Sequence, residues 1–220
     1  MFYRTDVRDH GLPHDPFKAL IAPRPIGWIS TISKDGICNL APYSFFNAVA
    51  SNPPYVMFAS AGIKDSARNA RDTGAFVCSL ATWDLREHMN VSSAPVPPGV
   101  DEFPIAGLTA VKSTAVAPPR VGQSPASFEC EYWQTVEIPG DDGATADYVV
   151  FGKVVGVYID ENFIKDGRVD TGAMQPIARM GYMDYAVVRP DTTFTLNRPK
   201  VDEDGNVTSP EANAWDGTYR

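Results

Sequence analysis

The stretch that decides the fold runs from Asn39 to Pro54 and reads NLAPYSFFNAVASNPP. It is rich in aromatic and small apolar residues, yet Pro42 lies inside it and the pair Pro53–Pro54 ends it. Proline removes a backbone donor, so the segment is poorly suited to continuous pairing in a central strand. We therefore predict an irregular connection that presents a flat apolar surface and leaves backbone donors free.

The sequence on either side of this stretch predicts strands, because β-branched and aromatic residues dominate it. The expected strands cover residues 26–33, 54–60, 76–80, 127–138 and 147–159. Turns are expected at Lys34–Gly36, Asp141–Gly143 and Asp166–Gly167. Gly152 and Gly156 lie inside the last strand and predict bulges or the close approach of a neighbouring backbone.

Two short helices are expected between these strands. In KDSARNARDTGAF, Ala67, Ala70 and Arg71 recur at helical spacing, with Asp65 or Ser66 as the cap and Gly74 as the stop. A second helix is predicted over Asp84–Val91, where Asp84 and Glu87 have capping-box spacing. Residues 93–100 are expected to form a loop. Many strands with few helices predict a closed or nearly closed β-barrel that helices plug or flank.

Composition excludes several classes of function. The 27 acidic and 19 basic side chains leave a net charge of -8 without a basic run, which disfavours nucleic acid as a partner. No apolar stretch approaches the roughly 20 residues that cross a bilayer, and the polar N-terminus MFYRTDVRDH is unlike a secretory signal, so we expect a cytoplasmic protein. The three cysteines are far apart and predict buried free thiols rather than a metal site. Neither a Rossmann fingerprint nor a P-loop motif is present.

The region after Ser60 has the residues of a phosphate-binding site. A predicted helix begins close to Lys64, Asp65 and Ser66, so backbone N–H groups, a hydroxyl and an ammonium group fall within one turn. The simpler alternative is an ordinary helix start with a solvated lysine.

The Asn39–Pro54 stretch, which precedes this helix, suits the ring of a flavin, since a flavin ring needs apolar faces and polar groups around its edge. Trp28, Ser30 and Thr31 of the preceding strand are candidates to line the same pocket. The alternative is that Trp28 and the aromatic residues Tyr43, Phe45 and Phe46 belong to the core.

The ordered segments RPIGWISTIS, NLAPYSFFNAVASNPP, KDSARNARDTGAFVCSL, SFECEYW and ARMGYMDYA resemble the flavin reductase-like family of FMN-binding split-barrel proteins, which includes the flavoredoxins. This resemblance covers the chain from about Arg24 to about Tyr185. It implies a mainly β fold, a six-stranded Greek-key split barrel with short flanking helices. The expected organisation is an N-terminal extension (1–23), the split-barrel domain (24–190) and a polar C-terminal tail (191–220). Because residues 198–220 are polar and acidic, we expect them to form a surface tail that reaches across a partner.

The resemblance also implies a homodimer with flavin near the subunit interface, and FMN or FAD as the cofactor. Carried over by position, the expected flavin-binding residues are Trp28, Ser30, Thr31, Ala41, Pro42, Tyr43, Ser44, Phe45, Asn47, Ser60, Lys64, Asp65, Ser66 and Arg179. Arg179 is a candidate for the phosphate or for the interface, and a surface salt bridge is an equal alternative. No catalytic side chain is expected, because flavin N5 carries the hydride chemistry.

The function implied by this resemblance is an NAD(P)H-dependent flavin reductase, which uses NADH or NADPH and supplies reduced flavin to a monooxygenase or another acceptor. The alternative is a flavoredoxin-like carrier that keeps its FMN and passes electrons to a redox protein. Two further hypotheses are a flavin-binding protein that acts on its own organic substrate and a barrel that binds no flavin.

Overall fold

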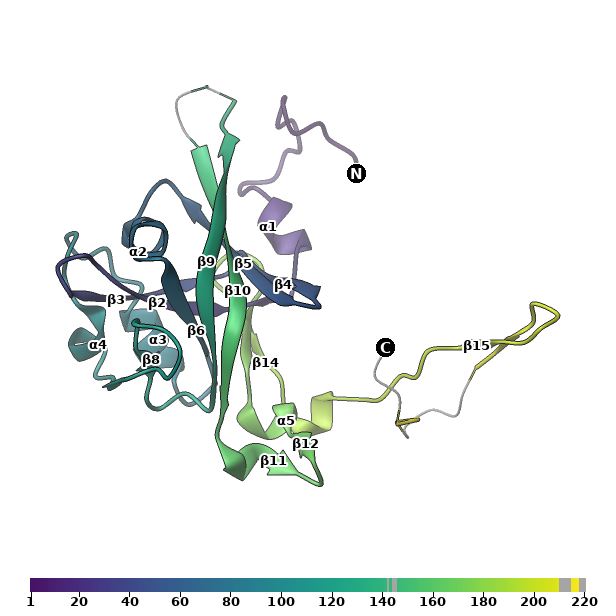
Figure 1. The fold of residues 1–220 in the computed structure, drawn as a ribbon. Helices are drawn as coiled ribbons and strands as arrows, with labels where there is room; N and C mark the ends of the chain where they lie inside the picture. Colours follow the sequence, from purple (N-terminus) through teal and green to yellow (C-terminus); the bar gives the residue numbers. More distant parts are fainter. Residues whose placement is uncertain (142, 144–145, 210–214, 218–220) are drawn as a thin grey trace.

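The structure is a computed structural model that describes residues 1–141, 143, 146–209 and 215–217. Figure 1 shows a barrel with a shorter N-terminal segment beside it and an extended C-terminal segment that leads away from it. Part of the predicted turn Asp141–Gly143, namely Asp142, lies outside the described residues. The same holds for parts of the predicted tail, namely residues 210–214 and 218–220.

Seven antiparallel strands form the main sheet in the order β3-β2-β6-β9-β10-β5-β4. Their bounds are β2 (Gly27–Ile32), β3 (Cys38–Tyr43), β4 (Phe46–Ser51), β5 (Pro54–Ala61), β6 (Ala75–Leu80), β9 (Ala126–Pro139) and β10 (Ala146–Ile159).

The sheet curls until β3 and β5 approach each other without forming a ladder. Ala59 N–H donates to the carbonyl oxygen of Phe45 at 2.8 Å, and the rings of Tyr43 and Phe58 pack at 4.8 Å. The six strands from β3 round to β5 therefore form the wall of a split barrel, and β4 pairs with the outer edge of β5. The predicted six-stranded split barrel is confirmed.

Strand β2 separates two hydrophobic layers because it is buried on both faces. Ile29 points into the barrel, where it joins Phe58, Phe76 and Val150. Trp28 points to the opposite face, into a second layer formed with residues of the segment 81–121. This alternation follows from the period of two in a strand.

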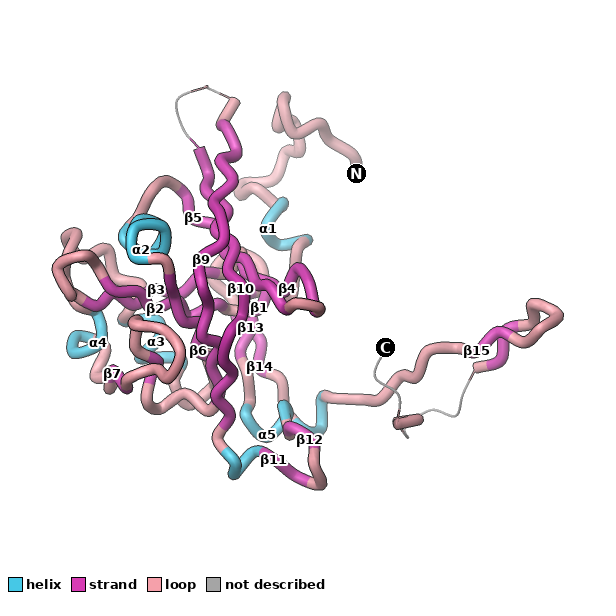
Figure 2. Tube along the Cα trace, viewed as in Figure 1, coloured by secondary structure: helices cyan, strands magenta, loops and turns pink. Residues whose placement is uncertain are grey.

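The helices are short and lie at the ends and sides of the barrel (Figure 2). They are α1 (Phe17–Leu20), α2 (Asp65–Thr73), α3 (Arg86–Val91), α4 (Glu102–Ile105) and α5 (Thr171–Met174), with 3-10 turns at Glu161–Phe163 and Pro190–Thr192. Helix α2 plugs the barrel, since Ala67 and Ala70 join the interior layer. Residues of α3 and α4, including Met89 and Phe103, complete the second layer, which contains Trp28 and is called the outer layer below.

Helix α2 confirms the predicted stop but corrects the predicted start. Gly74 has φ 80° and donates its N–H to Ala70, as a left-handed C-cap requires. The N-cap is Lys64, and no side chain caps the first turn, so the predicted cap from Asp65 or Ser66 is wrong. The capping box in α3 is also wrong, because that helix begins at Arg86 after Leu85, which makes no side-chain cap.

The stretch Asn39–Pro54 is more regular than predicted. It contains most of β3 and all of β4, and only Ser44–Phe45 and Asn52–Pro53 lie outside strands. The physical reason is that β3 ends the sheet order and pairs only with β2, so the missing N–H of Pro42 leaves no gap in a central ladder.

The two glycines of β10 behave as predicted. The β9–β10 register shifts between Phe151 and Gly152 and again between Val154 and Gly156. A Cβ atom on Gly152 would lie 2.4 Å from the ring of Phe76, so the neighbouring side chain approaches the backbone closely there. The predicted turn at Asp166–Gly167 is also present, because both residues have positive φ between the paired strands β11 and β12.

Smaller sheets complete the fold. They are formed by β1 (Arg24–Pro25), β13 (Ile177–Arg179) and β14 (Tyr185–Val187), by β7 (Ala110–Val111) and β8 (Arg120–Val121), by β11 (Ile164–Lys165) and β12 (Arg168–Val169), and by β15 (Lys200–Val201) and β16 (Val207–Thr208). All three cysteines are free; Cys78 and Cys130 are buried and Cys38 is half-buried. Among the described residues, no helix has the length and apolar character to span a membrane.

Candidate functional site

A cleft of about 810 Å³ lies where the end of β3 meets the start of α2. A volume of this size is within the usual range for small-molecule and cofactor sites. Its walls come from α1, the β3–β4 connection, the α2 start, the loop 92–98 and α4. The residues that line it include Phe17, Lys18, Asn39, Ala41, Pro42, Tyr43, Ser44, Phe45, Lys64, Asp65, Ser66, Arg68, Ser92, Ser93, Ala94, Pro95, Val96, Pro98, Glu102 and Asp147.

One wall of the cleft is apolar and aromatic. Ala41, Pro42 and Tyr43 form the last part of β3, and Phe45 follows in the connection to β4. The backbone hydrogen bond from Ala59 to Phe45 and the packing of Tyr43 on Phe58 hold this wall in place. A flat aromatic ligand would find an apolar face here.

Positive charge gathers beside this wall. Lys18 Nζ and the guanidinium of Arg24 each lie 6.0 Å from the centre of the Phe45 ring. Arg24 is buried and donates to the carbonyl oxygens of Lys18, Ile21 and Met180, so it ties α1 to the barrel. Burial lowers the pKa of the Arg24 guanidinium, and nearby Arg179 lowers it further.

The N-terminus of α2 borders the same cleft. No side chain caps the first turn, so the partial positive charge of the helix start is not neutralised by a cap. Lys64 makes no ion pair with any described residue, whereas Arg68 pairs with Asp65 at 2.5 Å. Asp65 also accepts from Gly99 N–H at 3.2 Å, which fastens the 92–100 loop to the helix. Lys64 is thus the cation here that is available to an anionic ligand.

A buried polar network lies behind the cleft. Asn39 Nδ2 donates to both carboxylate oxygens of Glu102 at 3.0 and 3.1 Å. Because the amide nitrogen faces Glu102, the amide oxygen Oδ1 of Asn39 faces away from it. That oxygen accepts from Ser66 Oγ at 2.7 Å and from Thr31 Oγ1 at 3.2 Å. Asn69 Nδ2 completes the chain by donating to Thr31 Oγ1. The network connects α4, β3, β2 and α2, so it sets how these elements frame the cleft.

Two titratable groups of the cleft have displaced pKa values. Burial raises the pKa of the Glu102 carboxyl, and hydrogen bonds from Leu40 N–H and Asn39 oppose that rise. Burial also raises the pKa of the Tyr43 phenol, while hydrogen bonds with Ser66 and Ser60 oppose the rise. Tyr43 therefore stays neutral and serves the cleft as an apolar wall with a fixed hydroxyl.

The structure brings together eight of the fourteen flavin-binding residues expected from the sequence. The eight that line the cleft are Ala41, Pro42, Tyr43, Ser44, Phe45, Lys64, Asp65 and Ser66. Contact with a flavin is a prediction for all of them, and the cleft shows only that they share one cavity.

The other six expected residues do not line the cleft. Trp28, Ser30, Thr31 and Ser60 are buried and bonded elsewhere, to Ser92, Pro119, Asn39 and Gly62 respectively. Asn47 is exposed on β4. Arg179 pairs opposite Arg24 in the β1–β13 ladder and donates to the phenol of Tyr185 and the carbonyl of Tyr182.

Sequence reasoning missed several polar residues of the cleft, among them Lys18, Asn39 and Glu102. Asn39 is the first residue of the quoted stretch, and its place directly before the apolar run that starts at Leu40 was the one available signal. Lys18 lies in the predicted extension and Glu102 follows the proline-rich loop. Neither has a local pattern that indicates a site.

Comparisons with known proteins place this geometry among flavin proteins. A sequence model of the flavin reductase-like domain matches residues 20–176. An uncharacterized protein of Halalkalibacterium halodurans is 34% identical over 188 residues, which cover 83% of this chain and 89% of that protein.

Solved structures show the same fold. Nitrilotriacetate monooxygenase component B from Bacillus cereus superposes with a TM-score of 0.78 at 28% identity, covering 85% of this chain and 95% of that one. The flavoredoxin of Desulfovibrio vulgaris (Miyazaki F) superposes with a TM-score of 0.68 at 22% identity, covering 76% of this chain and 87% of that one. At this identity the likeness shows a shared fold.

Proposed function

The chain belongs to the flavin reductase-like domain family, and from this premise we propose that it is an FMN-binding oxidoreductase that reduces flavin with NADH or NADPH. The observation that carries the proposal is the composition of one cleft, which has an aromatic wall at Pro42–Phe45 and an uncapped helix start with Lys64. These two parts match the two ends of FMN, a flat ring and a phosphate.

The residues of the cleft fit this cofactor. Lys64 and the backbone N–H groups at the start of α2 would hold the phosphate, which carries about -2 charge near neutral pH. The wall at Pro42, Tyr43 and Phe45 would cover one face of the ring and exclude water. FAD, which carries an additional nucleotide, is the larger alternative.

Bound flavin would supply the redox chemistry, because it accepts a hydride from a nicotinamide and passes electrons on. The chain's own residues then need only to position the two rings and to stabilise charge. The proposal is supported by the match to the flavin reductase-like domain and by the likeness, at 28% identity, to a component of a nitrilotriacetate monooxygenase. We propose a monooxygenase or another redox protein as the partner of this chain, and a homodimer in the cytoplasm as its working form.

The second candidate is a flavoredoxin-like carrier that keeps FMN and exchanges electrons with a protein. The observation that favours it is the shared fold with the flavoredoxin of Desulfovibrio vulgaris. In this case the cleft would hold FMN as a prosthetic group, and free flavin would not be a substrate.

A visible spectrum followed by two titrations separates these candidates. Protein that stays yellow through gel filtration and reduces only its own flavin supports the carrier. Colourless protein that oxidises NADH or NADPH when free FMN is added supports the reductase. Protein that neither binds flavin at ~1 mM FMN nor oxidises a nicotinamide contradicts both, because ~1 mM is the upper end of the usual range of KM values.

A further inference from the structure

A second cavity, of about 360 Å³, lies between α3 and the strands β13 and β14. A volume of this size is within the range of small-molecule sites. We name it the α3 cavity, and its lining includes Trp83, Arg86, Glu87, Met89, Ile177 and Tyr185. Among the described residues, none lines both this cavity and the cleft at the start of α2, so the two cavities are separate.

The inner surface of the α3 cavity is apolar, and its rim is aromatic. Met89 and Ile177 are buried members of the outer layer. Trp83 and Tyr185 are 38% and 41% exposed and contribute one ring each. Trp83 is held in place because its backbone N–H donates to the carbonyl oxygen of Gln175 at 2.9 Å. A flat apolar group would find packing partners here that are already in position.

Three arginines lie beside these aromatic rings. The guanidinium of Arg86 lies 3.9 Å from the centre of the Trp83 ring, and that of Arg189 lies 5.5 Å from the same centre. The guanidinium of Arg179 lies 4.6 Å from the centre of the Tyr185 ring. Two positive charges beside one indole ring repel each other. An anion that binds next to Trp83 would offset this repulsion.

The positive charge of the three guanidiniums is largely unpaired. Among the described residues, Glu87 is the one carboxylate that pairs with any of them, at 3.5 Å from Arg86 Nε, and its side chain is 77% exposed. An ion pair this exposed is weak. Arg179 donates to a phenol and to a backbone carbonyl, which are both neutral. The Arg189 guanidinium donates to no described residue, so it is available to a ligand.

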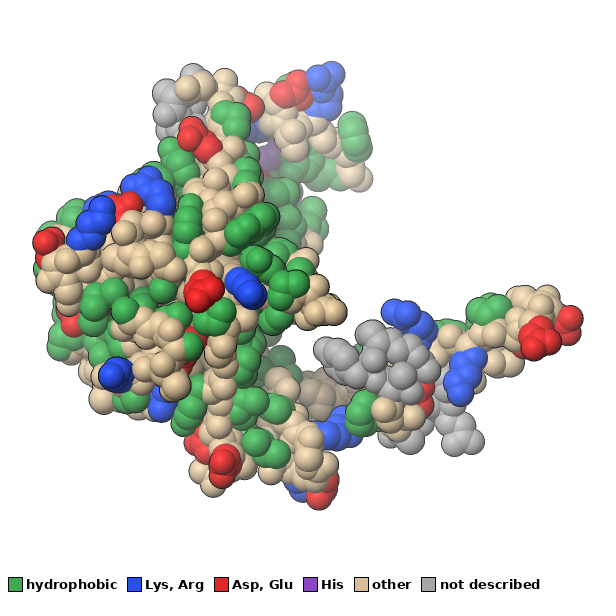
Figure 3. Space-filling model, viewed as in Figure 1, with side chains coloured by type: hydrophobic (Ala, Val, Ile, Leu, Met, Phe, Trp, Pro, Cys, Tyr) green, Lys and Arg blue, Asp and Glu red, His purple; other side chains and the backbone are tan. Residues whose placement is uncertain are grey.

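This excess of positive charge differs from the balance in the rest of the chain. The whole chain carries a net charge of -8, and Figure 3 shows acidic and basic side chains interspersed over one face of the barrel. At the α3 cavity, three guanidiniums share one carboxylate partner. Charge complementarity therefore favours an anionic ligand, and the fork of a guanidinium matches the two oxygens of a carboxylate.

We propose that the α3 cavity binds a small aromatic carboxylate. Its ring would contact Met89 and Ile177, and its carboxylate would bind Arg86 and Arg189 beside Trp83. The apolar interior selects for a ring, and the guanidiniums select for the charge. This proposal does not depend on what the cleft binds, because the two cavities share no described residue.

The first test compares three probes by titration calorimetry on the full-length wild-type protein. Benzoate should bind with a dissociation constant below ~1 mM, the upper end of the usual range for enzyme substrates. Benzyl alcohol has the ring without the charge, and acetate has the charge without the ring. Each should bind at least tenfold more weakly than benzoate. Absence of benzoate binding at a tenfold higher concentration, or equal affinity for benzoate and benzyl alcohol, overturns the proposal.

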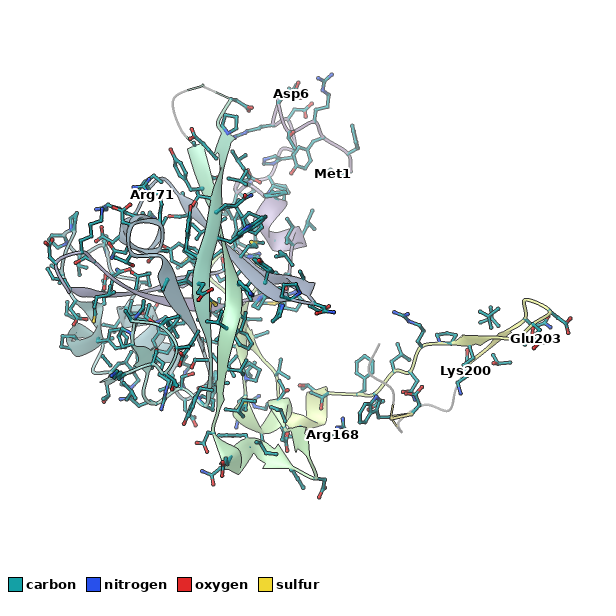
Figure 4. The ribbon with its side chains drawn as sticks, in the orientation of Figure 1. Met1, Asp6, Arg71, Arg168, Lys200 and Glu203 are labelled. Carbon is teal, nitrogen blue, oxygen red and sulfur yellow. The ribbon has the colours of Figure 1, made fainter. Side chains whose placement is uncertain are left out.

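The second test removes the two arginines beside Trp83. Arg86→Gln combined with Arg189→Gln should raise the dissociation constant of benzoate at least tenfold and leave the circular dichroism unchanged. Arg4→Gln combined with Arg71→Gln is the matched control, because it changes the net charge equally and neither residue lines either cavity. Figure 4 labels Arg71 on α2 and Asp6, the ion-pair partner of Arg4, in the N-terminal segment. If both double variants bind benzoate alike, the proposal is wrong.

The third test locates the bound acid. Benzoate should change the tryptophan fluorescence of the wild type, and Trp83→Phe should abolish that change. Trp133→Phe is the control, since Trp133 is exposed on β9 and lines neither cavity, and it should keep the change. A full response in Trp83→Phe refutes the location. Competition between benzoate and FMN would place the acid in the cleft and refute it as well.

Discussion

Ser66 donates its hydroxyl proton to Asn39 Oδ1 across 2.7 Å, and both side chains are almost fully buried. The direction of this bond is set by Glu102, which accepts both donor contacts from the Asn39 amide and leaves its oxygen for Ser66. A hydroxyl has one proton to donate. Ser66 thus offers lone pairs rather than a proton to anything else nearby, and Lys64 becomes the main side-chain donor for an anion at this helix start.

Lys64→Ala should weaken FMN binding about tenfold or more while changing riboflavin binding less than twofold. A hydrogen bond to a charged group is worth about 1.5–3 kcal/mol, and only FMN carries the phosphate. Fluorescence titration with both ligands measures the difference. Lys34→Ala is the matched control, because Lys34 pairs with Asp72 at 3.6 Å and does not line the cleft. Equal losses for the two ligands would remove Lys64 from the phosphate role.

Ser66→Ala should lower the free energy of unfolding by about 1 kcal/mol and weaken FMN less than Lys64→Ala does. The variant removes a buried hydrogen bond, but Asn39 Oδ1 keeps its bond from Thr31. Urea unfolding and FMN titration on the same preparation measure both effects. A loss of FMN affinity as large as that of Lys64→Ala, with stability unchanged, would show that Ser66 acts on the ligand directly.

Glu102 should contribute less to the stability of the protein as the pH rises. Burial raises its pKa in the folded state, so the folded protein holds this proton more tightly than the unfolded chain does. The stabilisation that this proton gives is fully present at a pH below the pKa of Glu102 in the unfolded chain, which is about 4.3. It is lost as the pH rises through the pKa of Glu102 in the folded protein. Subtracting the pH profile of Glu102→Gln from that of the wild type isolates this residue. A difference that is flat, or that grows with pH, contradicts the assignment.

Gly152→Ala should lower the free energy of unfolding by about 1–3 kcal/mol, because its Cβ would lie 2.4 Å from the buried Phe76 ring. Gly156→Ala is the matched control on the same strand, since its Cβ would meet Glu129 no closer than 3.3 Å. Urea unfolding of both variants tests this. If Gly156→Ala costs as much as Gly152→Ala, then the shared loss of glycine at a bulge is the cause and not the Phe76 contact.

Local features of the fold were predictable because they depend on neighbours in sequence. The alternation of Ile26, Trp28 and the following positions predicts a strand over residues 26–33, and β2 confirms it. Gly74 ends α2 because glycine adopts a left-handed conformation without strain. The errors were also local: Asp84 and Glu87 have the spacing of a cap, but α3 starts later, where packing places Leu85 and Met89 in the outer layer.

The sequence by itself determined the strand periods, the helix stop, the two bulge glycines and the family, because each rests on residues that act within a few positions of one another. Only the tertiary structure decided which polar groups meet at the cleft. Asn39 and Glu102 are separated by 63 positions and touch because β3 runs along the edge of a curled sheet beneath α4. Such a meeting follows from how far the sheet curls, and no short segment of the chain encodes that curvature.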